Sequence, residues 1–297
     1  MAFVQPEWTY KMNVVDGIPF PPFVTQQHMD QLKNFPLRSD DIILATYPKS
    51  GTTWMQQILK LIYTGGKENG KNVSEAVPWL ERGTVSMDTS NPNAAVDFEN
   101  MPSPRLLSSH APYRLVPGGS PSSSPAKYIY VARNPKDVAV SFYYHSRAFK
   151  AYEYSGNWEH FYTLFVRGEV EFGSWFDHVL GWWEHRDQKN ILFLKYEDMQ
   201  RDLRASVQRI ISFCGKDDLS PEVIDSVVQL SSFQSMKVNS LANGEWHSPF
   251  RNTEIASFVR KGIVGDWKNH FSPEQNEEFD AMYAGKMKGS GLEFSFE

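Results

Sequence analysis

Four short apolar runs predict buried parallel strands. They are rich in β-branched and aromatic residues, polar or turn residues bound them, and they span 41–47, 105–110, 127–133 and 190–196. Hydrophobicity on almost every position is typical of strands that are covered on both faces, as in a parallel sheet.

Between and after these runs, apolar residues recur at helical spacing, in the segments 51–63, 135–149, 174–186, 198–214, 220–231 and 272–288. Asn134 before Pro135, and Ser272 before Pro273, are helix-start signals. Strands that alternate with helices predict an α/β fold with a mostly parallel central sheet flanked by helices. No linker divides regions of different composition, so we expect a single domain over residues 1–297.

Composition limits the classes of binding partner that we expect. The 30 basic and 35 acidic residues give a net charge of -5, which argues against a general nucleic-acid binder. The N-terminus lacks a signal-peptide pattern, and no apolar run approaches the roughly 18 residues of a membrane span. We therefore expect a cytoplasmic protein that binds neither nucleic acid nor membrane.

The stretch ATYPKSGTTW (45–54) lies where the first predicted strand meets a helix. A helix start offers free backbone N–H groups and the positive end of the dipole, which favour phosphate. The residues that would hold an anion are Lys49, Ser50, Gly51, Thr52 and Thr53. A capped helix start is the alternative interpretation of Gly-Thr-Thr alone. In a Walker A loop the lysine follows the glycines, whereas here it precedes the only glycine. We therefore interpret the stretch as a P-loop-like phosphate loop for a donor other than the nucleotides that Walker A loops bind.

TYPKSGTTW resembles the 5′-phosphosulfate-binding loop of the cytosolic sulfotransferases, and FVRKGIVGDWKNHF (258–271) resembles their 3′-phosphate-binding segment. VARNPKDVAVSFY (131–143) and LKYEDM (194–199) lie between them in the family's order. The resemblance extends from residue 17 to the C-terminus. It implies 3′-phosphoadenosine 5′-phosphosulfate (PAPS) as donor, 3′-phosphoadenosine 5′-phosphate (PAP) as product, and no metal ion.

The resemblance assigns donor-binding roles to particular residues. Residues 49–53 would hold the 5′-phosphosulfate. The 3′-phosphate would lie against Arg133, Ser141, Arg260, Lys261 and Gly262, and arginine forks suit phosphate oxygens. A surface salt bridge at Arg133 and a solvated basic turn at 260–262 are the alternatives. The adenine-side residues and the start of the second motif would be Trp54, Tyr196, Ser232, Phe233, Met236 and Phe258.

The same resemblance makes His110, in LLSSHAPY, the base that takes the acceptor's proton during in-line displacement at sulfur. Histidine suits proton transfer near neutral pH. Lys49 would stabilise the leaving group, and Ser141 would contact Lys49 until the acceptor binds. Ser108 stands where many relatives have a lysine, so we expect the rate or the acceptor class to differ from theirs. The other seven histidines are interpreted as surface or packing residues.

For the acceptor, rough alignment predicts an apolar pocket that takes a phenol, a steroid or another small alcohol or amine. Its expected residues are Phe20, Phe23, Trp79, Arg82, Phe142, Tyr143, Phe149 and Phe250. Arg82 would meet a polar or acidic group on the acceptor if it points inward. Its alternative is an exposed loop position.

The family's dimer motif is altered here. Positions 268–277 read KNHFSPEQNE, with Ser272 and Pro273 in place of Thr-Val. Proline has no N–H for pairing between chains, so we expect a monomer or a weak homodimer.

Three other functions stay open at this point. One is a P-loop nucleotide or nucleoside kinase that needs Mg²⁺ and ATP. Another is a non-catalytic nucleotide-binding protein, which stays open because Ser108 stands where many relatives have a lysine. The third is an enzyme that sulfates an allylic alcohol and then eliminates sulfate.

Overall fold

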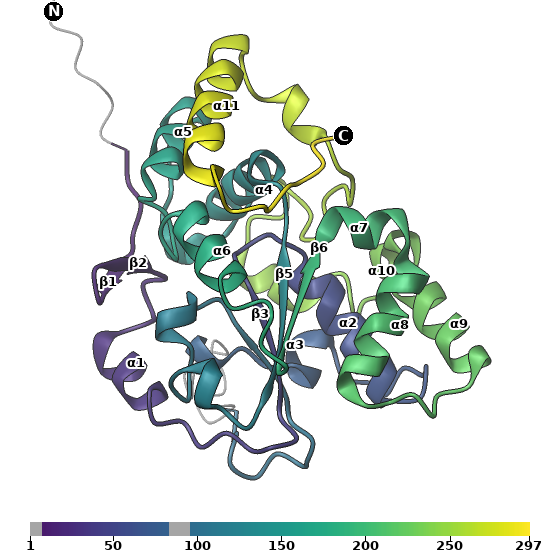
Figure 1. Ribbon diagram of the computed structural model, residues 1–297. Coiled ribbons are helices and arrows are strands. Elements are labelled where there is room, and N and C mark those ends of the chain that lie inside the picture. Colours follow the sequence, from purple (N-terminus) through teal and green to yellow (C-terminus); the bar gives the residue numbers. More distant parts are fainter. Residues whose placement is uncertain (1–7, 83–95) are drawn as a thin grey trace, which may run out of the picture.

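The computed structural model describes residues 8–82 and 96–297 (Figure 1). Its centre is a four-stranded parallel sheet in the order β4-β3-β5-β6. The strands are β3 (Ile42–Thr46), β4 (Leu106–Ser109), β5 (Lys127–Ala132) and β6 (Ile191–Lys195). All four strands predicted from hydrophobic runs are confirmed, and so is the α/β fold. A small antiparallel pair, β1 (Asn13–Val15) with β2 (Ile18–Phe20), lies outside this sheet.

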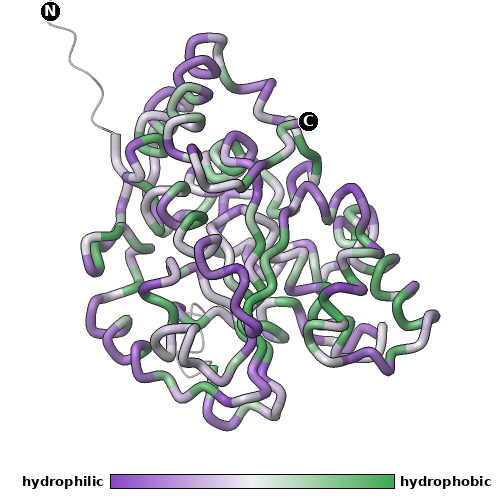
Figure 2. The backbone as a smooth tube through the Cα atoms, in the orientation of Figure 1, coloured by the Kyte–Doolittle hydropathy of each residue, from purple (hydrophilic) through white to green (hydrophobic). Residues whose placement is uncertain are grey.

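The central strands are buried on both faces, as their composition predicts. Along β3, Ile43 and Ala45 belong to one hydrophobic cluster, whereas Ile42 and Leu44 belong to another. This alternation follows from the two-residue period of a strand. Figure 2 shows the result, with hydrophobic segments concentrated in the central strands.

Helices cover the two faces of the sheet in two groups (Figure 1). One group packs on the cluster that contains Ile43 and consists of α4 (Pro135–Ala148), α5 (Trp158–Arg167), α6 (Trp175–Trp183) and α11 (Pro273–Met287). The other packs on the cluster that contains Ile42 and includes α2 (Thr52–Tyr63), α7 (Tyr196–Arg201), α8 (Leu203–Cys214) and α9 (Pro221–Leu230). Shorter elements are α1 (Gln26–Leu32), α3 (Val73–Ala76), α10 (Phe233–Val238), η1 (Leu80–Arg82), η2 (Tyr113–Leu115), η3 (Pro121–Ser123), η4 (Lys150–Tyr152), η5 (Glu245–Phe250) and η6 (Asp266–Asn269).

The segment 198–214, predicted as one helix, is two helices in the structure. α7 ends at Arg201, and Asp202 has an extended φ of -145°. The Asp202 carboxylate accepts a hydrogen bond from the N–H of Ala205 at 2.9 Å, which caps the start of α8. The capping residue therefore splits a continuous helical pattern.

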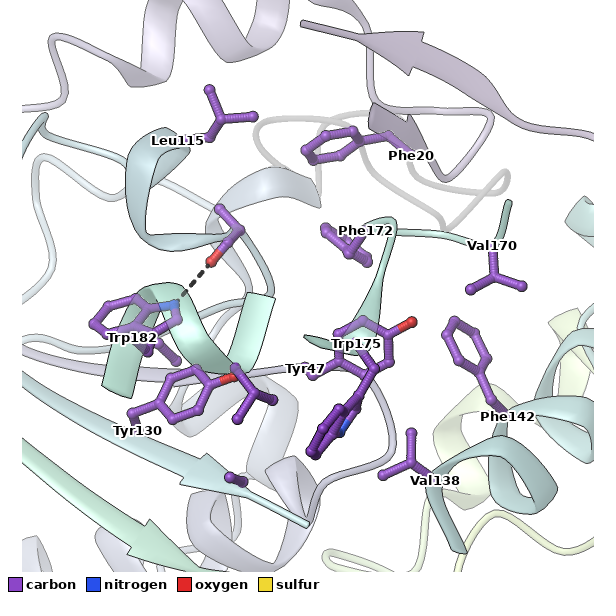
Figure 3. Packing of buried hydrophobic residues seen from close by; sticks show 14 of the residues in the cluster. Phe20, Tyr47, Leu115, Tyr130, Val138, Phe142, Val170, Phe172, Trp175 and Trp182 are labelled. Atoms are coloured by element: carbon purple, nitrogen blue, oxygen red, sulfur yellow. Dashed lines mark hydrogen bonds between the residues drawn. The ribbon is translucent and has the colours of Figure 1, made fainter. Parts of the chain in front are cut away.

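The core on the α4–α6 side is rich in aromatic residues (Figure 3). Trp175 and Trp182 are almost completely buried there, and Trp182 stacks on Tyr130 with ring centres 5.0 Å apart. The indole N–H of Trp182 donates to the carbonyl of Ala111 at 3.5 Å (Figure 3). This packing fixes the segment that immediately follows β4.

Parallel strands place their carboxyl ends on one edge of the sheet, where ligands bind in open α/β folds. β3, β4, β5 and β6 end at Thr46, Ser109, Ala132 and Lys195. The chain segments that leave these four ends form the site described next.

Candidate active site

A cavity of about 420 Å³ lies at the carboxyl edge of the sheet. Each central strand delivers a side chain to its wall just after the strand ends. These side chains are Lys49 after β3, His110 after β4, Arg133 after β5 and Tyr196 after β6. A cation, an imidazole, a guanidinium and a phenol ring thus face one space.

The loop between β3 and α2 has the backbone of an anion-binding turn. Lys49 has a φ of 68° and Gly51 a φ of 107°, both in the left-handed region. No side chain caps α2, so backbone N–H groups of its first turn are left for a ligand. A Cβ on Gly51 would lie 2.9 Å from Cδ2 of Tyr196, so glycine is needed for close packing as well as for its φ.

Four of the five residues predicted for this loop line the cavity, and Ser50 does not. Ser50 is completely buried, and its hydroxyl has no hydrogen-bond partner among the described residues. Thr52 lines the cavity, and its hydroxyl lies 2.7 Å from that of Thr46. The structure therefore brings Lys49, Gly51, Thr52 and Thr53 together.

A second group of cations lines the same cavity. Arg133 and Ser141 reach the wall from the β5–α4 segment, and Arg260, Lys261 and Gly262 reach it from the chain before η6. The Arg133 guanidinium donates to the carbonyl of Ile263 at 2.9 Å and lies 4.5 Å from the ring centre of Tyr196. The two motifs, more than 100 residues apart, therefore meet.

Two aspartates hold this basic segment, and sequence reasoning missed both. Asp137, on α4, accepts from the N–H groups of Gly265 at 2.8 Å and Trp267 at 3.0 Å. Asp266 pairs with Arg260 at 2.6 Å and with Lys261 at 2.5 Å. Despite burial, hydrogen bonds from Lys261 and Arg260 lower the pKa of Asp266 to about 2, so it stays ionised.

Orphaned donors mark this basic group as an anion site. The Nε–H groups of Arg133 and Arg260 are buried and have no hydrogen-bond partner within residues 8–82 and 96–297. Unpaired buried donors are costly. An anion with several oxygens fits these groups.

Flat side chains line the same cavity as the two anion-binding groups. Trp54 and Phe233 line the cavity, as do Tyr196, Ser232, Met236 and Phe258, so all the predicted aromatic-side residues are brought together. The indole N–H of Trp54 donates to the carbonyl of Ser231 at 2.7 Å, which fixes the ring. A Cβ on Gly262 would lie 2.1 Å from Cδ2 of Phe233, so only glycine lets that ring pack against the basic segment.

His110 presents its Nε2 atom as a free base. Its Nδ1 lies 2.8 Å from the carbonyl oxygen of Thr46, and because that oxygen can only accept, Nδ1 carries the proton. Burial, with a smaller contribution from Lys49, lowers the pKa of His110 to about 4. The imidazole is therefore neutral at ordinary pH, with Nε2 unprotonated.

Two buried side chains hold the backbone around His110. One carboxylate oxygen of Glu81 accepts from the N–H groups of His110 at 2.8 Å and Ala111 at 2.7 Å. The Nε2–H of His178 donates to the His110 carbonyl at 2.9 Å, and its Nδ1 accepts from the Tyr130 hydroxyl at 2.8 Å. Hydrophobic periodicity carries no signal for these contacts, since they join four distant segments.

Lys49 is held differently from the expectation. Its Nζ lies 3.4 Å from Nδ1 of His145 and 5.1 Å from the ring centre of Phe258. Ser141 also lines the cavity, but its hydroxyl makes no hydrogen bond to Lys49. Burial, then the nearby Arg251 and Arg133, lower the pKa of Lys49 to about 7.

The other end of the cavity is mostly aromatic. Of the predicted acceptor residues, Phe23, Trp79, Arg82 and Phe149 line it. Those that the structure places elsewhere are Phe20 and Phe142, which are completely buried in the core (Figure 3), Tyr143, which packs on the same core, and Phe250, which ends η5. Ser108 lines the cavity too, and its hydroxyl donates to the Val77 carbonyl at 3.2 Å.

Sequence reasoning missed several residues of this end, namely His145, Tyr152, Glu171, Phe172, Trp246 and His247. His145 and His247 were interpreted as surface or packing residues, but both face the cavity. Burial raises the pKa of Glu171 to about 8. An acidic residue in an apolar segment was the only sequence signal for Glu171.

Comparisons with known proteins show to which class of protein this chain belongs. The family model "Sulfotransferase domain" matches residues 39–291. The chain is 40% identical over 292 residues to Sulfotransferase 1C2 of Rattus norvegicus, covering 97% of this chain and 96% of that protein. Mouse sulfotransferase SULT7A1, solved in complex with PAP, superposes with a TM-score of 0.75 at 30% identity, over 94% of this chain and 95% of that chain.

A retinol dehydratase solved with retinol and PAP superposes with a TM-score of 0.78 at 26% identity, over 94% of this chain and 89% of that chain. Together, the fold and the matches define an α/β enzyme that transfers sulfo groups. The chain belongs to the sulfotransferase family. Within the described residues, no helix has the length and apolar content to span a membrane.

Proposed function

We propose that this enzyme moves the sulfo group of PAPS to the hydroxyl, or amine, of a small hydrophobic acceptor, and that residues 1–297 work as one domain. The observation that carries the proposal is one cavity lined by two groups of anion-binding residues and by several aromatic rings. PAPS carries the matching parts, which are a 5′-phosphosulfate, a 3′-phosphate and an adenine ring. The PAP bound in SULT7A1 supports the same donor.

For the donor, the Lys49 loop and the start of α2 would hold the 5′-phosphosulfate. The 3′-phosphate would be held by Arg133, Ser141, Arg260 and Lys261, because all four line the same cavity. The buried Nε–H groups of Arg133 and Arg260 have no hydrogen-bond partner among the described residues, and phosphate oxygens would supply one. Adenine would pack against Trp54 and Phe233, since nucleobases stack well on aromatic rings.

For the chemistry, the acceptor hydroxyl would give its proton to Nε2 of His110 as its oxygen attacks sulfur. The bond between sulfur and the 5′-phosphate oxygen then breaks, and the electron pair leaves with PAP. Lys49 would stabilise the negative charge that grows on the departing oxygen. The Thr46 carbonyl holds His110 in the tautomer that can accept this proton.

Lys49 would be restrained before transfer by His145 rather than by Ser141, because the side-chain partner of its Nζ is Nδ1 of His145, at 3.4 Å. This changes the residue expected from the family resemblance. Ser141 keeps its proposed place beside the 3′-phosphate.

The aromatic wall supports an apolar, ring-sized acceptor, because Phe23, Trp79 and Phe149 line that end. Ser108 removes a cation from this region, and its hydroxyl is already engaged with Val77. A single anion-stabilising lysine, Lys49, would then serve the transferring group.

The oligomeric state is also proposed, as a monomer or a weak homodimer. Ser272 and Pro273 act within their own chain, because Ser272 accepts from the N–H of Gln275 at 3.1 Å and caps α11, with Pro273 in the first turn. This capping role accounts for both residues without a second chain. The cytoplasmic location stays a prediction from the sequence.

The test is transfer of radiolabelled sulfo groups from PAPS to a panel of phenols, alcohols and amines without added metal. Labelled product is expected with native protein, and His110→Ala should yield almost none. Analysis of the product separates a stable sulfate ester from an alkene plus free sulfate, which the similarity to retinol dehydratase makes worth checking. Phosphate transfer from ATP–Mg²⁺ with no sulfo transfer would contradict the proposal.

A further inference from the structure

Glu171 places a buried carboxyl group in the wall of the acceptor end. The residue lies in the loop between α5 and α6, is 2% exposed, and lines the cavity. One carboxyl oxygen accepts a hydrogen bond from the Tyr10 hydroxyl at 3.0 Å, and the Tyr152 hydroxyl lies beside the group. Two phenols therefore hold the carboxyl in a fixed position.

No cationic side chain pairs with this carboxyl. Within residues 8–82 and 96–297, no lysine or arginine nitrogen lies within the 4.0 Å of a salt bridge to Glu171. A buried carboxylate without a counter-ion is costly. Burial accordingly raises the pKa of Glu171 to about 8. Lys49 lowers this pKa without forming a salt bridge, and a cation entering the cavity would supply the missing partner.

The neighbours of Glu171 connect it to the reacting end. The ring of the next residue, Phe172, has its centre 5.4 Å from that of His110. Trp79 packs on the same imidazole at 5.3 Å, with the rings steeply inclined to each other. The Glu171 carboxyl lies close enough to Lys49 for the two charges to interact, which places it near the reacting end. A cavity that presents a base, a carboxyl and two aromatic rings fits a flat ring that carries polar groups at both ends.

We propose that Glu171 selects acceptors that carry a protonated amino group, with the acceptor's hydroxyl toward His110 and its ammonium toward the Glu171 carboxylate. This inference rests on the proposed function and names its acceptor class, a hydroxyl-bearing aromatic amine. The charge-assisted hydrogen bond would be made in a largely water-free wall, where such bonds are strong.

Arg82 supports the opposite class. It lines the same cavity, and burial lowers its pKa, so it would favour an acceptor with a carboxylate. Glu171 is the stronger determinant because two hydroxyl groups fix its carboxyl. The experiment below separates the two.

Three para-substituted phenols of similar size make a matched series: tyramine is cationic, 4-ethylphenol is neutral and 4-hydroxyphenylacetate is anionic. Native protein should favour tyramine over 4-ethylphenol by about 10- to 100-fold in kcat/KM, the range for hydrogen bonds to charged groups. Glu171→Gln keeps an oxygen for Tyr10 and should bring the two phenols to within about threefold. Glu169→Gln changes an exposed residue of the same loop and should leave the preference unchanged.

Binding of each phenol to the PAP complex, measured by calorimetry, gives a second readout that needs no turnover. Equal use and equal binding of tyramine and 4-ethylphenol, with normal PAP binding, would overturn the Glu171 inference alone. So would a preference for 4-hydroxyphenylacetate that Arg82→Gln abolishes. Failure to bind PAP at all would instead overturn the proposed function.

Discussion

The two ends of the cavity are built in different ways. The donor end uses strand ends, a helix start and contiguous motifs, so its geometry is set largely by backbone. The acceptor end takes single side chains from distant segments, among them Phe23, Trp79, Phe149 and Glu171. A backbone-built site should tolerate few changes and bind one ligand. A side-chain-built site can change its acceptor while the donor end stays the same.

His110 lies where the two ends meet, and its replacement should have the largest effect. His110→Ala is expected to lower the transfer rate by about 10²- to 10⁴-fold, because a positioned general base contributes that much. Initial rates with labelled PAPS measure it. PAP affinity should stay within about twofold, because the imidazole is proposed to accept a proton and not to bind a phosphate of the donor. An equal loss of PAP affinity would mean that His110 belongs to the donor end.

Lys49 belongs to the donor end but acts during transfer. Lys49→Met should lower kcat by about 10²- to 10³-fold, the cost of removing one preorganised group that stabilises developing charge. Single-turnover kinetics on the preformed PAPS complex isolate this step. Lys67→Met, in the loop after α2, is an exposed control with unchanged rate expected. A loss confined to KM would contradict a role in the transition state.

Gly262 tests how far backbone sets the donor end. Gly262 has a φ of 65°, and an added Cβ would displace Phe233, so Gly262→Ala should weaken PAP by about 10- to 100-fold, as expected for a lost stacking partner. The matched control is Gly285→Ala in α11, where nothing lies within 4 Å of the added Cβ. It should bind PAP normally and raise the free energy of unfolding by about 0.5–1 kcal/mol. Equal PAP affinity in both variants would mean that backbone geometry at residue 262 does not control the donor end.

Proton uptake on PAP binding should be the smallest of these effects. It reports on the charge of Lys49, which belongs to the donor end. The pKa of Lys49 is lowered to about 7, so at pH 8 the amine is mostly neutral in the free protein. A phosphate beside it raises that pKa, and PAP binding should therefore take up a fraction of a proton at pH 8 and less at pH 6. Calorimetry in buffers of different ionisation enthalpy measures the uptake. The same uptake in Lys49→Met would assign it to another group.

Sequence reasoning reached the donor end because its residues are adjacent in the chain. The order Lys49 to Thr53 between a strand and a helix carries its own geometry, and all four strands follow from their apolar runs. Ser50 illustrates the limit, since the residue type fits an anion site but its side chain is completely buried and does not line the cavity.

The acceptor end was harder because tertiary packing decides which aromatic residue faces the cavity. Phe20 and Phe142 have the right type, yet they fill the core, whereas Phe172 faces the cavity from a loop. His145 lies on α4, and its contact with Lys49 can be predicted only once the Lys49 loop is known to pack beside that helix. Asp137 and Glu81 hold backbone N–H groups of distant segments, and hydropathy carries no signal for such contacts.

The most direct test of the proposed donor site is calorimetric titration with PAP, with 5′-AMP and ATP–Mg²⁺ as controls. We expect micromolar binding of PAP and at least about 10- to 100-fold weaker binding of 5′-AMP, because losing the 3′-phosphate removes charge-assisted hydrogen bonds to Arg133 and Arg260. Equal affinity for 5′-AMP, or a preference for ATP–Mg²⁺, would contradict a site built for PAPS.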